Sequence, residues 1–295
     1  MLNYYNEIKN QLINNEITKR IKDYSKNKSD LNTYYSVGKL LSEAGKHYGD
    51  GIIKEYSKRL TSELGKGYGV TNLKNMRKFY ITFSKSQALP DQLSWSHCIE
   101  LLKLKNINAI NYYIDISMRQ NIGYRELGTR IKNKEYERLP EKTRLKLINK
   151  DDNKVEDFIK NPIIIRNPNN IEVTKEKVLQ RLILEDIPSF LKELGNGFCF
   201  IENEYKIKIG NTFNYIDILL FNIEFNCYIV VELKVTELRK EYIGQVEVYM
   251  NYIDSNLRKN NQDKTIGIII CKKDNKYVID YCSDKRILSK EYELV

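Results

Sequence analysis

The fold of this chain is decided by two apolar stretches in its second half, NYIDILLF (residues 214–221) and CYIVVELKV (residues 227–235). Both have the β-branched and aliphatic composition of buried strands, yet they contain Asp217, Glu232 and Lys234. A buried charge costs free energy unless it is paired or binds a metal. Because side chains alternate along a strand, Glu232 and Lys234 lie on one face, about 7 Å apart along the chain. The three charges predict a compact site with metal-binding carboxylates beside a lysine.

These residue types suit phosphodiester hydrolysis, which requires an activated water and neutralisation of developing negative charge. The carboxylate oxygens of Asp217 and Glu232 are hard ligands of the kind that Mg²⁺ or Mn²⁺ prefers. Lys234 would orient or deprotonate the attacking water, or stabilise the anionic transition state, and the sequence leaves these roles open. Taken alone, Asp217 could also be an ordinary edge-strand charge.

Further motifs occur in a fixed order on both sides of these strands. The second half contains FLKELGNGF (190–198), GQVEVY (244–249) and TIGIIIC (265–271), and the first half contains YYSVGKL (34–40), GYGVTNL (67–73), MRKFY (76–80) and LSWSH (93–97). With these motifs the chain resembles, over nearly its whole length, the YhcG-type family of two-part bacterial proteins in the PD-(D/E)XK nuclease superfamily. The resemblance implies an α/β C-terminal domain with a restriction-endonuclease-like mixed sheet flanked by helices, preceded by an all-α N-terminal domain.

The resemblance also implies site residues. Asp217 and Glu232 would hold Mg²⁺ or Mn²⁺. Gln245 and Tyr249 would be further catalytic residues on a helix over the site, where their i, i+4 spacing puts them on one face, consistent with contacts to the attacking water or to the strand being cut. Ordinary packing or surface contacts are the alternative for these two residues. One position departs from the family pattern, because Gln180 stands where a helix glutamate is usual. Glutamine adds no negative charge, and Glu185 lies about 140° further round the helix. The departure leaves open whether one or two metals bind.

Charge is shared unevenly between the two halves. Residues 1–150 contain 28 Lys and Arg against 15 Asp and Glu, whereas residues 151–295 contain 21 against 24. This asymmetry favours a first half that binds a polyanion and a second half that cuts it. Candidate phosphate contacts in the first half are Arg77, Lys78, Lys103 and Lys105. A solvated helical surface is the alternative.

The chain is expected to divide into a helical, basic domain (1–139) for nucleic-acid or partner binding, a linker (140–157) and a nuclease-like domain (158–295). Glycine turns between short helices in the first domain fit a helix-turn-helix-like module, although a helical bundle for dimerisation would look similar. In the second domain the pattern predicts helices and strands in α-β-β-β-α-β order. The segments are a helix at 174–194, strands at 198–209, 215–221 and 228–235, a helix at 241–257, a strand at 265–271 and a weaker strand at 277–282.

Composition indicates a cytoplasmic protein that does not associate with a membrane. No apolar run approaches the length of a membrane span, and the N-terminus lacks a signal-peptide core. The five cysteines form no C-x-x-C pair, so core thiols are expected rather than a zinc site. The chain contains only two histidines, so a histidine-based active site is not expected.

The sequence as a whole predicts a Mg²⁺-dependent endodeoxyribonuclease. RNA as the substrate remains open, as does a non-catalytic nucleic-acid-binding or scaffold protein that retains the nuclease fold. The presence of Asp217, Glu232 and Lys234 together argues against the scaffold, because a decayed site would normally have lost one of them. A role in restriction, phage defence or recombination, with a homodimer or a defence protein as partner, is implied by the resemblance only.

Overall fold

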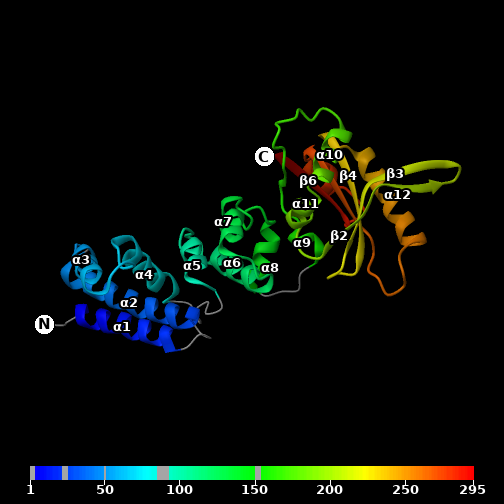
Figure 1. The fold of residues 1–295 in the computed structure, drawn as a ribbon. Helices are drawn as coiled ribbons and strands as arrows, with labels where there is room; N and C mark the ends of the chain where they lie inside the picture. Colours follow the sequence, from blue (N-terminus) through cyan, green and yellow to red (C-terminus); the bar gives the residue numbers. More distant parts are fainter. Residues whose placement is uncertain (1–3, 22–25, 50, 85–92, 150–153) are drawn as a thin grey trace. The chain divides into compact units, whose positions relative to one another are not determined.

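The structure is a computed structural model that describes residues 4–21, 26–49, 51–84, 93–149 and 154–295. It divides into two compact units, Met1–Tyr136 and Glu137–Val295 (Figure 1). Among the described residues, no helix is both long enough and apolar enough to cross a membrane. All five cysteines are free thiols; four are buried, as expected of core residues, and Cys199 is exposed.

The first unit is helical, which confirms the predicted all-α N-terminal domain. Gly38 allows two of its helices to approach closely, because a Cβ at this position would lie 2.1 Å from the carbonyl oxygen of Met76. His97 has a structural role: its Nδ1 lies 2.7 Å from Ser94 Oγ at a helix start, and its Nε2 lies 2.9 Å from the Ile122 carbonyl oxygen. The helices are α1 (Tyr4–Ile21), α2 (Lys26–Tyr48), α3 (Ile52–Leu64), α4 (Val70–Phe83), α5 (Trp95–Leu101), α6 (Ile107–Arg119) and α7 (Tyr124–Lys132).

The second unit is built on a six-stranded sheet with the order β1-β6-β5-β4-β3-β2. Strands β2, β3 and β4 pair antiparallel, whereas β4, β5, β6 and β1 pair parallel, so the predicted mixed sheet is confirmed. The strands are β1 (Ile163–Ile165), β2 (Phe198–Ile209), β3 (Thr212–Asn222), β4 (Cys227–Glu237), β5 (Ile266–Lys273) and β6 (Ile287–Leu294).

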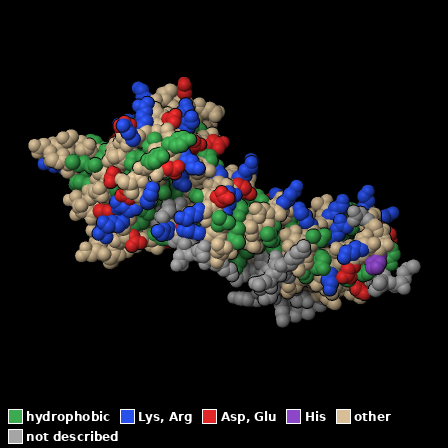
Figure 2. Space-filling view, turned by 180° about the vertical axis from the view of Figure 1, so that it is seen from behind, with side chains coloured by type: hydrophobic (Ala, Val, Ile, Leu, Met, Phe, Trp, Pro, Cys, Tyr) green, Lys and Arg blue, Asp and Glu red, His purple; other side chains and the backbone are tan. Residues whose placement is uncertain are grey.

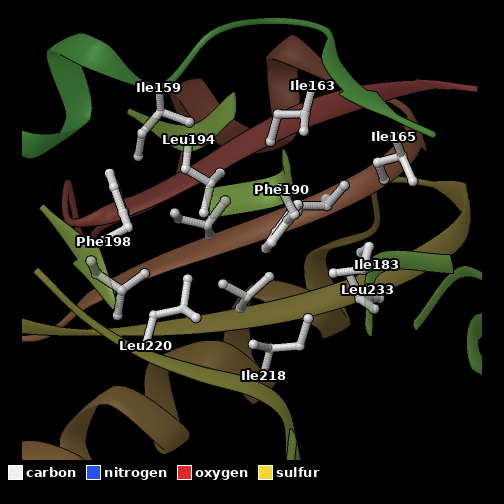
Figure 3. Close-up of a cluster of buried hydrophobic side chains, with 14 of the residues drawn as sticks. Ile159, Ile163, Ile165, Ile183, Phe190, Leu194, Phe198, Ile218, Leu220 and Leu233 are labelled. Atoms are coloured by element: carbon white, nitrogen blue, oxygen red, sulfur yellow. The ribbon is translucent and has the colours of Figure 1, made fainter. Parts of the chain in front are cut away.

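Helices cover both faces of this sheet. On one face, α10 (Glu176–Glu185) and α11 (Ile187–Leu194) fill a layer with the strands, and Figure 3 shows Ile183 and Phe190 in the same cluster as Ile218 and Leu233. On the other face, α12 (Lys240–Asn256) packs on the sheet. It can do so because Gly267 has no side chain, since a Cβ there would lie 2.4 Å from a methyl carbon of Val246.

Two of the predicted elements differ in the structure. The prediction of a strand at 277–282 is wrong: α13 (Lys276–Asp280) lies there, with the Asn275 side chain accepting a hydrogen bond from the Val278 amide at its start. The helix predicted at 174–194 is interrupted at Asp186, whose carboxylate accepts from the Ser189 amide and so begins α11 as a separate helix.

The segment predicted to be a linker contains two helices, α8 (Glu141–Asn149) and α9 (Val155–Phe158). A 2.6 Å ion pair between Lys146 and Asp157 joins them, and Thr143 is fully buried beside Asp157. Some polar side chains of this segment therefore pair with one another. A sequence pattern does not distinguish such pairs from the solvated side chains of a linker.

A buried lysine on β6 gives a testable stability effect. Burial lowers the pKa of Lys290 to about 8, and its Nζ donates a 2.8 Å hydrogen bond to the Ile159 carbonyl. Between pH 8 and 10.5 the unfolded chain binds more protons at this residue than the folded protein does. Lys290 therefore destabilises the fold fully below pH 8, and the penalty disappears as the pH rises through that window.

We expect Lys290→Met to raise the free energy of unfolding at pH 7 by about 1 to 2 kcal/mol. This is the roughly 3 kcal/mol of the charge penalty, reduced because the Ile159 carbonyl loses its donor. Urea unfolding at pH 7 and pH 10 measures the effect, which should shrink at the higher pH. A variant that is less stable than the wild type at pH 7 would contradict the expectation.

Candidate active site

Asp217 lies where β3 separates from β4. The paired register between these strands reaches Ile218 and Val231 and goes no further. At the next position, Asp217 Oδ2 accepts a 2.8 Å hydrogen bond from the Leu233 amide, and Gln180 Nε2 on α10 donates to the Asp217 carbonyl oxygen at 3.0 Å. Gln180 therefore fixes the main chain at Asp217, where the pairing of β3 with β4 has ended.

Glu232 and Lys234 lie together on β4, as their alternation predicted. Lys234 Nζ donates to Glu232 Oε1 at 2.8 Å, and both side chains are buried. The ammonium also lies 4.9 Å from the centre of the Tyr242 ring at the start of α12. The lysine is thus held between a carboxylate and an aromatic face.

The charged form of both carboxylates is destabilised in the site. Burial and, next, the nearby charge of Asp217 raise the pKa of Glu232 to about 7, while Lys234 opposes the shift. Burial also raises the pKa of Asp217 above its usual value, although the Leu233 amide lowers it. In addition, Glu232 Oε2 is buried and has no hydrogen-bond partner within the described part of the chain.

These features fit a divalent cation. Two hard carboxylate donors, one of them with an unsatisfied buried oxygen, form a locally anionic site that a cation would neutralise. Within the described ranges, no group of three or more His, Cys, Asp or Glu side chains is arranged to hold a metal.

Sequence reasoning missed a third acidic residue at this site, Glu176. Its Oε1 lies 3.3 Å from Lys234 Nζ, and its side chain is 44% exposed. Glu176 is one helical turn before Gln180 on α10, so an i, i+4 search from Gln180 could have found it. The helix α10 thus supplies an acidic group at Glu176, four residues before Gln180, the position at which the family usually has a glutamate.

Gln245 and Tyr249 lie on one face of α12, as their spacing predicted. Gln245 Nε2 donates a 2.9 Å hydrogen bond to the Tyr249 hydroxyl. Burial raises the pKa of Tyr249, the Gln245 bond opposes the shift, and the charges of Glu232 and Asp217 add to it. The hydroxyl is therefore within electrostatic range of the carboxylates.

The basic residues predicted in the first unit separate into two groups. Arg77 and Lys78 line a pocket of about 540 Å³, which Lys54 and Lys74 also line. Lys103 instead pairs with Glu100 at 2.6 Å, and Lys105 is exposed outside this pocket. Lys and Arg side chains are frequent on the face of this unit seen in Figure 2. The structure therefore brings two of the four candidates together with two further lysines.

Comparison with known proteins places both halves of the chain. A family model described as the YhcG PDDEXK nuclease domain matches residues 156–295, and the DUF1016 N-terminal domain matches residues 8–138. The chain is 24% identical over 283 residues to "Putative nuclease YhcG" of Escherichia coli strain K12, covering 81% of this chain and 76% of that protein.

Two solved structures show more distant similarity, and the matches span about half the length of each. A repair endonuclease from Pyrococcus abyssi matches 41% of this chain and 48% of its own at 16% identity and a TM-score of 0.30. A structure described as an EndoMS-dsDNA2 complex matches 42% and 47% at 17% identity and a TM-score of 0.31. From the matches of its two halves, this chain belongs to the YhcG-type family and carries a PD-(D/E)XK nuclease domain.

Proposed function

We propose that the protein is a metal-dependent endonuclease that hydrolyses phosphodiester bonds in DNA, with Asp217, Glu232 and Lys234 at its active site. The observation that carries the proposal is the buried and unpartnered Glu232 Oε2 beside a second, half-buried carboxylate, that of Asp217, and a lysine. A structural ion pair alone would not need two adjacent carboxylates with raised pKa values, because such an arrangement destabilises the fold.

Asp217 and Glu232 would hold Mg²⁺ or Mn²⁺. When bound, the cation supplies charge neutralisation and a lowered pKa for water. Lys234 keeps its ammonium beside Glu232, where it can stabilise the negative charge that develops on the phosphoryl oxygens. Glu176 Oε1 also contacts that ammonium, at 3.3 Å, and restricts its position.

Two amides in the site have positioning roles in this proposal. Gln180 holds the main chain of Asp217, and so keeps the carboxylate facing β4. Gln245 donates to the Tyr249 hydroxyl, and that contact orients the hydroxyl hydrogen away from Gln245, toward a water or a substrate oxygen.

A cleavage panel tests the proposal. Full-length protein is incubated with linear, branched, single-stranded and modified DNA and with RNA, in Mg²⁺, in Mn²⁺ and in EDTA. The proposal expects internal cleavage of DNA that requires the metal. Cleavage of RNA without cleavage of DNA would overturn the substrate class, and no cleavage of any substrate would overturn the function.

We also propose that the pocket lined by Lys54, Lys74, Arg77 and Lys78 binds the phosphates of the same substrate. Of the residues lining it, four are cations and none is acidic. Such a contact is sequence-independent and weakens as the salt concentration rises, because the counterions that binding releases from the DNA then gain less entropy. The alternative for the helical unit is a protein-interaction or dimerisation surface.

Lys54→Gln/Lys74→Gln should weaken DNA binding by the full-length protein about tenfold at low salt. The slope of log affinity against log salt should fall by about 1 to 2, because each lost phosphate contact removes about 0.9. Fluorescence anisotropy at several salt concentrations measures both quantities. Lys103→Gln/Lys105→Gln is the matched control, since it removes the same charge from the same unit outside the pocket. Equal effects of the two double variants would rule out a specific role for the pocket.

A further inference from the structure

The hairpin formed by β2 and β3 extends beyond the strands that carry the rest of the site. Figure 1 draws its far end, in yellow, projecting past the other strands of the sheet. Residues 205–216 keep a regular antiparallel register, with Lys206 opposite Tyr215 and Lys208 opposite Phe213. Because the β3–β4 pairing ends at Ile218, this part of the hairpin is a two-stranded ribbon within the described sheet.

The two faces of this ribbon differ. On one face, Ile207 and Ile216 are fully buried in the same cluster as α12, which anchors the ribbon. The other face carries Lys206, Lys208, Phe213 and Tyr215, all of them exposed; it is called the ribbon face below. Each of the two aromatic side chains on it is 52% exposed.

The composition of the ribbon face indicates a ligand with both flat rings and negative charge. Lys206 Nζ lies 3.9 Å from the centre of the Phe213 ring, so cations and aromatic surfaces alternate at short range. Residues 205–216 contain no Asp or Glu. Lysines on an edge strand protect it against aggregation, which would explain Lys206 and Lys208 by themselves. Exposed aromatic side chains promote aggregation, so this explanation does not account for Phe213 and Tyr215. Bases stack on aromatic side chains and phosphates pair with lysines, which is the chemistry of single-stranded nucleic-acid binding.

The ribbon face is also close to the proposed active site along the chain. Tyr215 and Phe213 precede Asp217 on the same strand by two and four residues. At about 3.4 Å per residue, they lie about 7 and 14 Å from it along the strand. Both rings therefore lie within the length of a few nucleotides of Asp217. In a duplex the base faces are stacked on one another, so these rings require unpaired nucleotides.

We propose that the ribbon face binds single-stranded nucleic acid next to the cleavage site, with Phe213 and Tyr215 stacking on bases and Lys206 and Lys208 binding phosphates. The substrate is accordingly DNA with unpaired nucleotides beside the cut, such as a tailed or branched duplex. The position of the cut rests on the proposed function, whereas binding by the ribbon face does not.

The test measures binding by the full-length protein in EDTA, so that cleavage plays no part. The probes are a blunt duplex and the same duplex with a single-stranded tail that contains 2-aminopurine. Phe213→Ala/Tyr215→Ala should weaken binding to the tailed duplex at least tenfold and should abolish the stacking-induced change in 2-aminopurine fluorescence. Binding to the blunt duplex should change less than twofold. Phe213→Trp/Tyr215→Trp should restore both signals.

Tyr277→Ala/Tyr281→Ala is the matched control, because these two tyrosines, on α13 and at its C-terminal end in the same unit, are 79% and 88% exposed. It should leave both probes unaffected. Equal affinity of the wild type and Phe213→Ala/Tyr215→Ala for the tailed duplex would overturn the inference, as would equal losses on both probes. If the wild type cleaves DNA but Phe213→Ala/Tyr215→Ala binds the tailed duplex as the wild type does, the inference about the ribbon face fails and the proposed nuclease function is retained. If tail binding depends on the ribbon face but no substrate is cleaved, the proposed function fails and the binding site stands.

Discussion

Glu232→Gln and Asp217→Asn are each expected to slow DNA cleavage by the full-length protein at least about 1000-fold, which corresponds to about 4 kcal/mol of transition-state stabilisation. Each change removes the charge from an oxygen proposed to hold the metal and keeps the shape of the side chain. Single-turnover cleavage at saturating Mg²⁺ measures the rate. DNA binding through the basic pocket of the first unit should persist in both variants.

The stability of the same variants separates lost chemistry from lost folding. In EDTA, Glu232→Gln should unfold at a temperature equal to or above that of the wild type, because it removes a buried charge that Asp217 repels. Glu237→Gln is the matched control, since Glu237 lies on the same strand but is exposed and pairs with Lys273. Its cleavage rate should equal that of the wild type. A fully active Glu232→Gln variant would be incompatible with the proposed site.

Lys234→Met should lower the cleavage rate at least about 100-fold while metal binding is retained. The ammonium is proposed to act on charge that develops only in the transition state, so its loss reduces turnover more than ground-state binding. Methionine preserves an unbranched chain against Tyr242, which limits the loss of packing. Metal affinity should stay the same or increase, because Glu232 Oε1 loses the ammonium that competes for it.

Single-turnover rates and Mn²⁺ titrations of Lys234→Met give the two readouts. Lys273→Met serves as the control, because Lys273 is an exposed lysine on the neighbouring β5. It should behave as the wild type in both experiments. If Lys234→Met loses metal binding as well as activity, the role of Lys234 is to position the carboxylates and not to stabilise the transition state.

The strands at residues 214–221 and 227–235 could be predicted because they contain charged residues within otherwise apolar sequence. Apolar residues on both sides of Asp217 and Glu232 indicate burial, and burial makes a charge informative. Glu176 offers no such contrast, since it stands in a helix with other Lys and Glu residues. Its relevance depends on how α10 packs on β4, which brings it to Lys234, and packing of this kind is not visible in a local pattern.

The ribbon face illustrates a second limit of sequence patterns. The alternation of apolar and polar residues in 205–216 is typical of a strand with one buried face, but it does not reveal which residues are buried. Ile207 and Ile216 are buried because α12 covers them, whereas Phe213 and Tyr215 lie on the opposite face of the ribbon and are exposed. The basic pocket is similar, since Lys54 and Lys74 come from different helices.

The most direct test of the central claim is a calorimetric titration of Mn²⁺ into metal-free, full-length protein. The wild type and Glu237→Gln should bind the metal with the same stoichiometry and affinity. Asp217→Asn and Glu232→Gln should give no binding heat over the same concentration range. A wild type without binding heat, or carboxylate variants that bind as the wild type does, would contradict a metal site formed by Asp217 and Glu232.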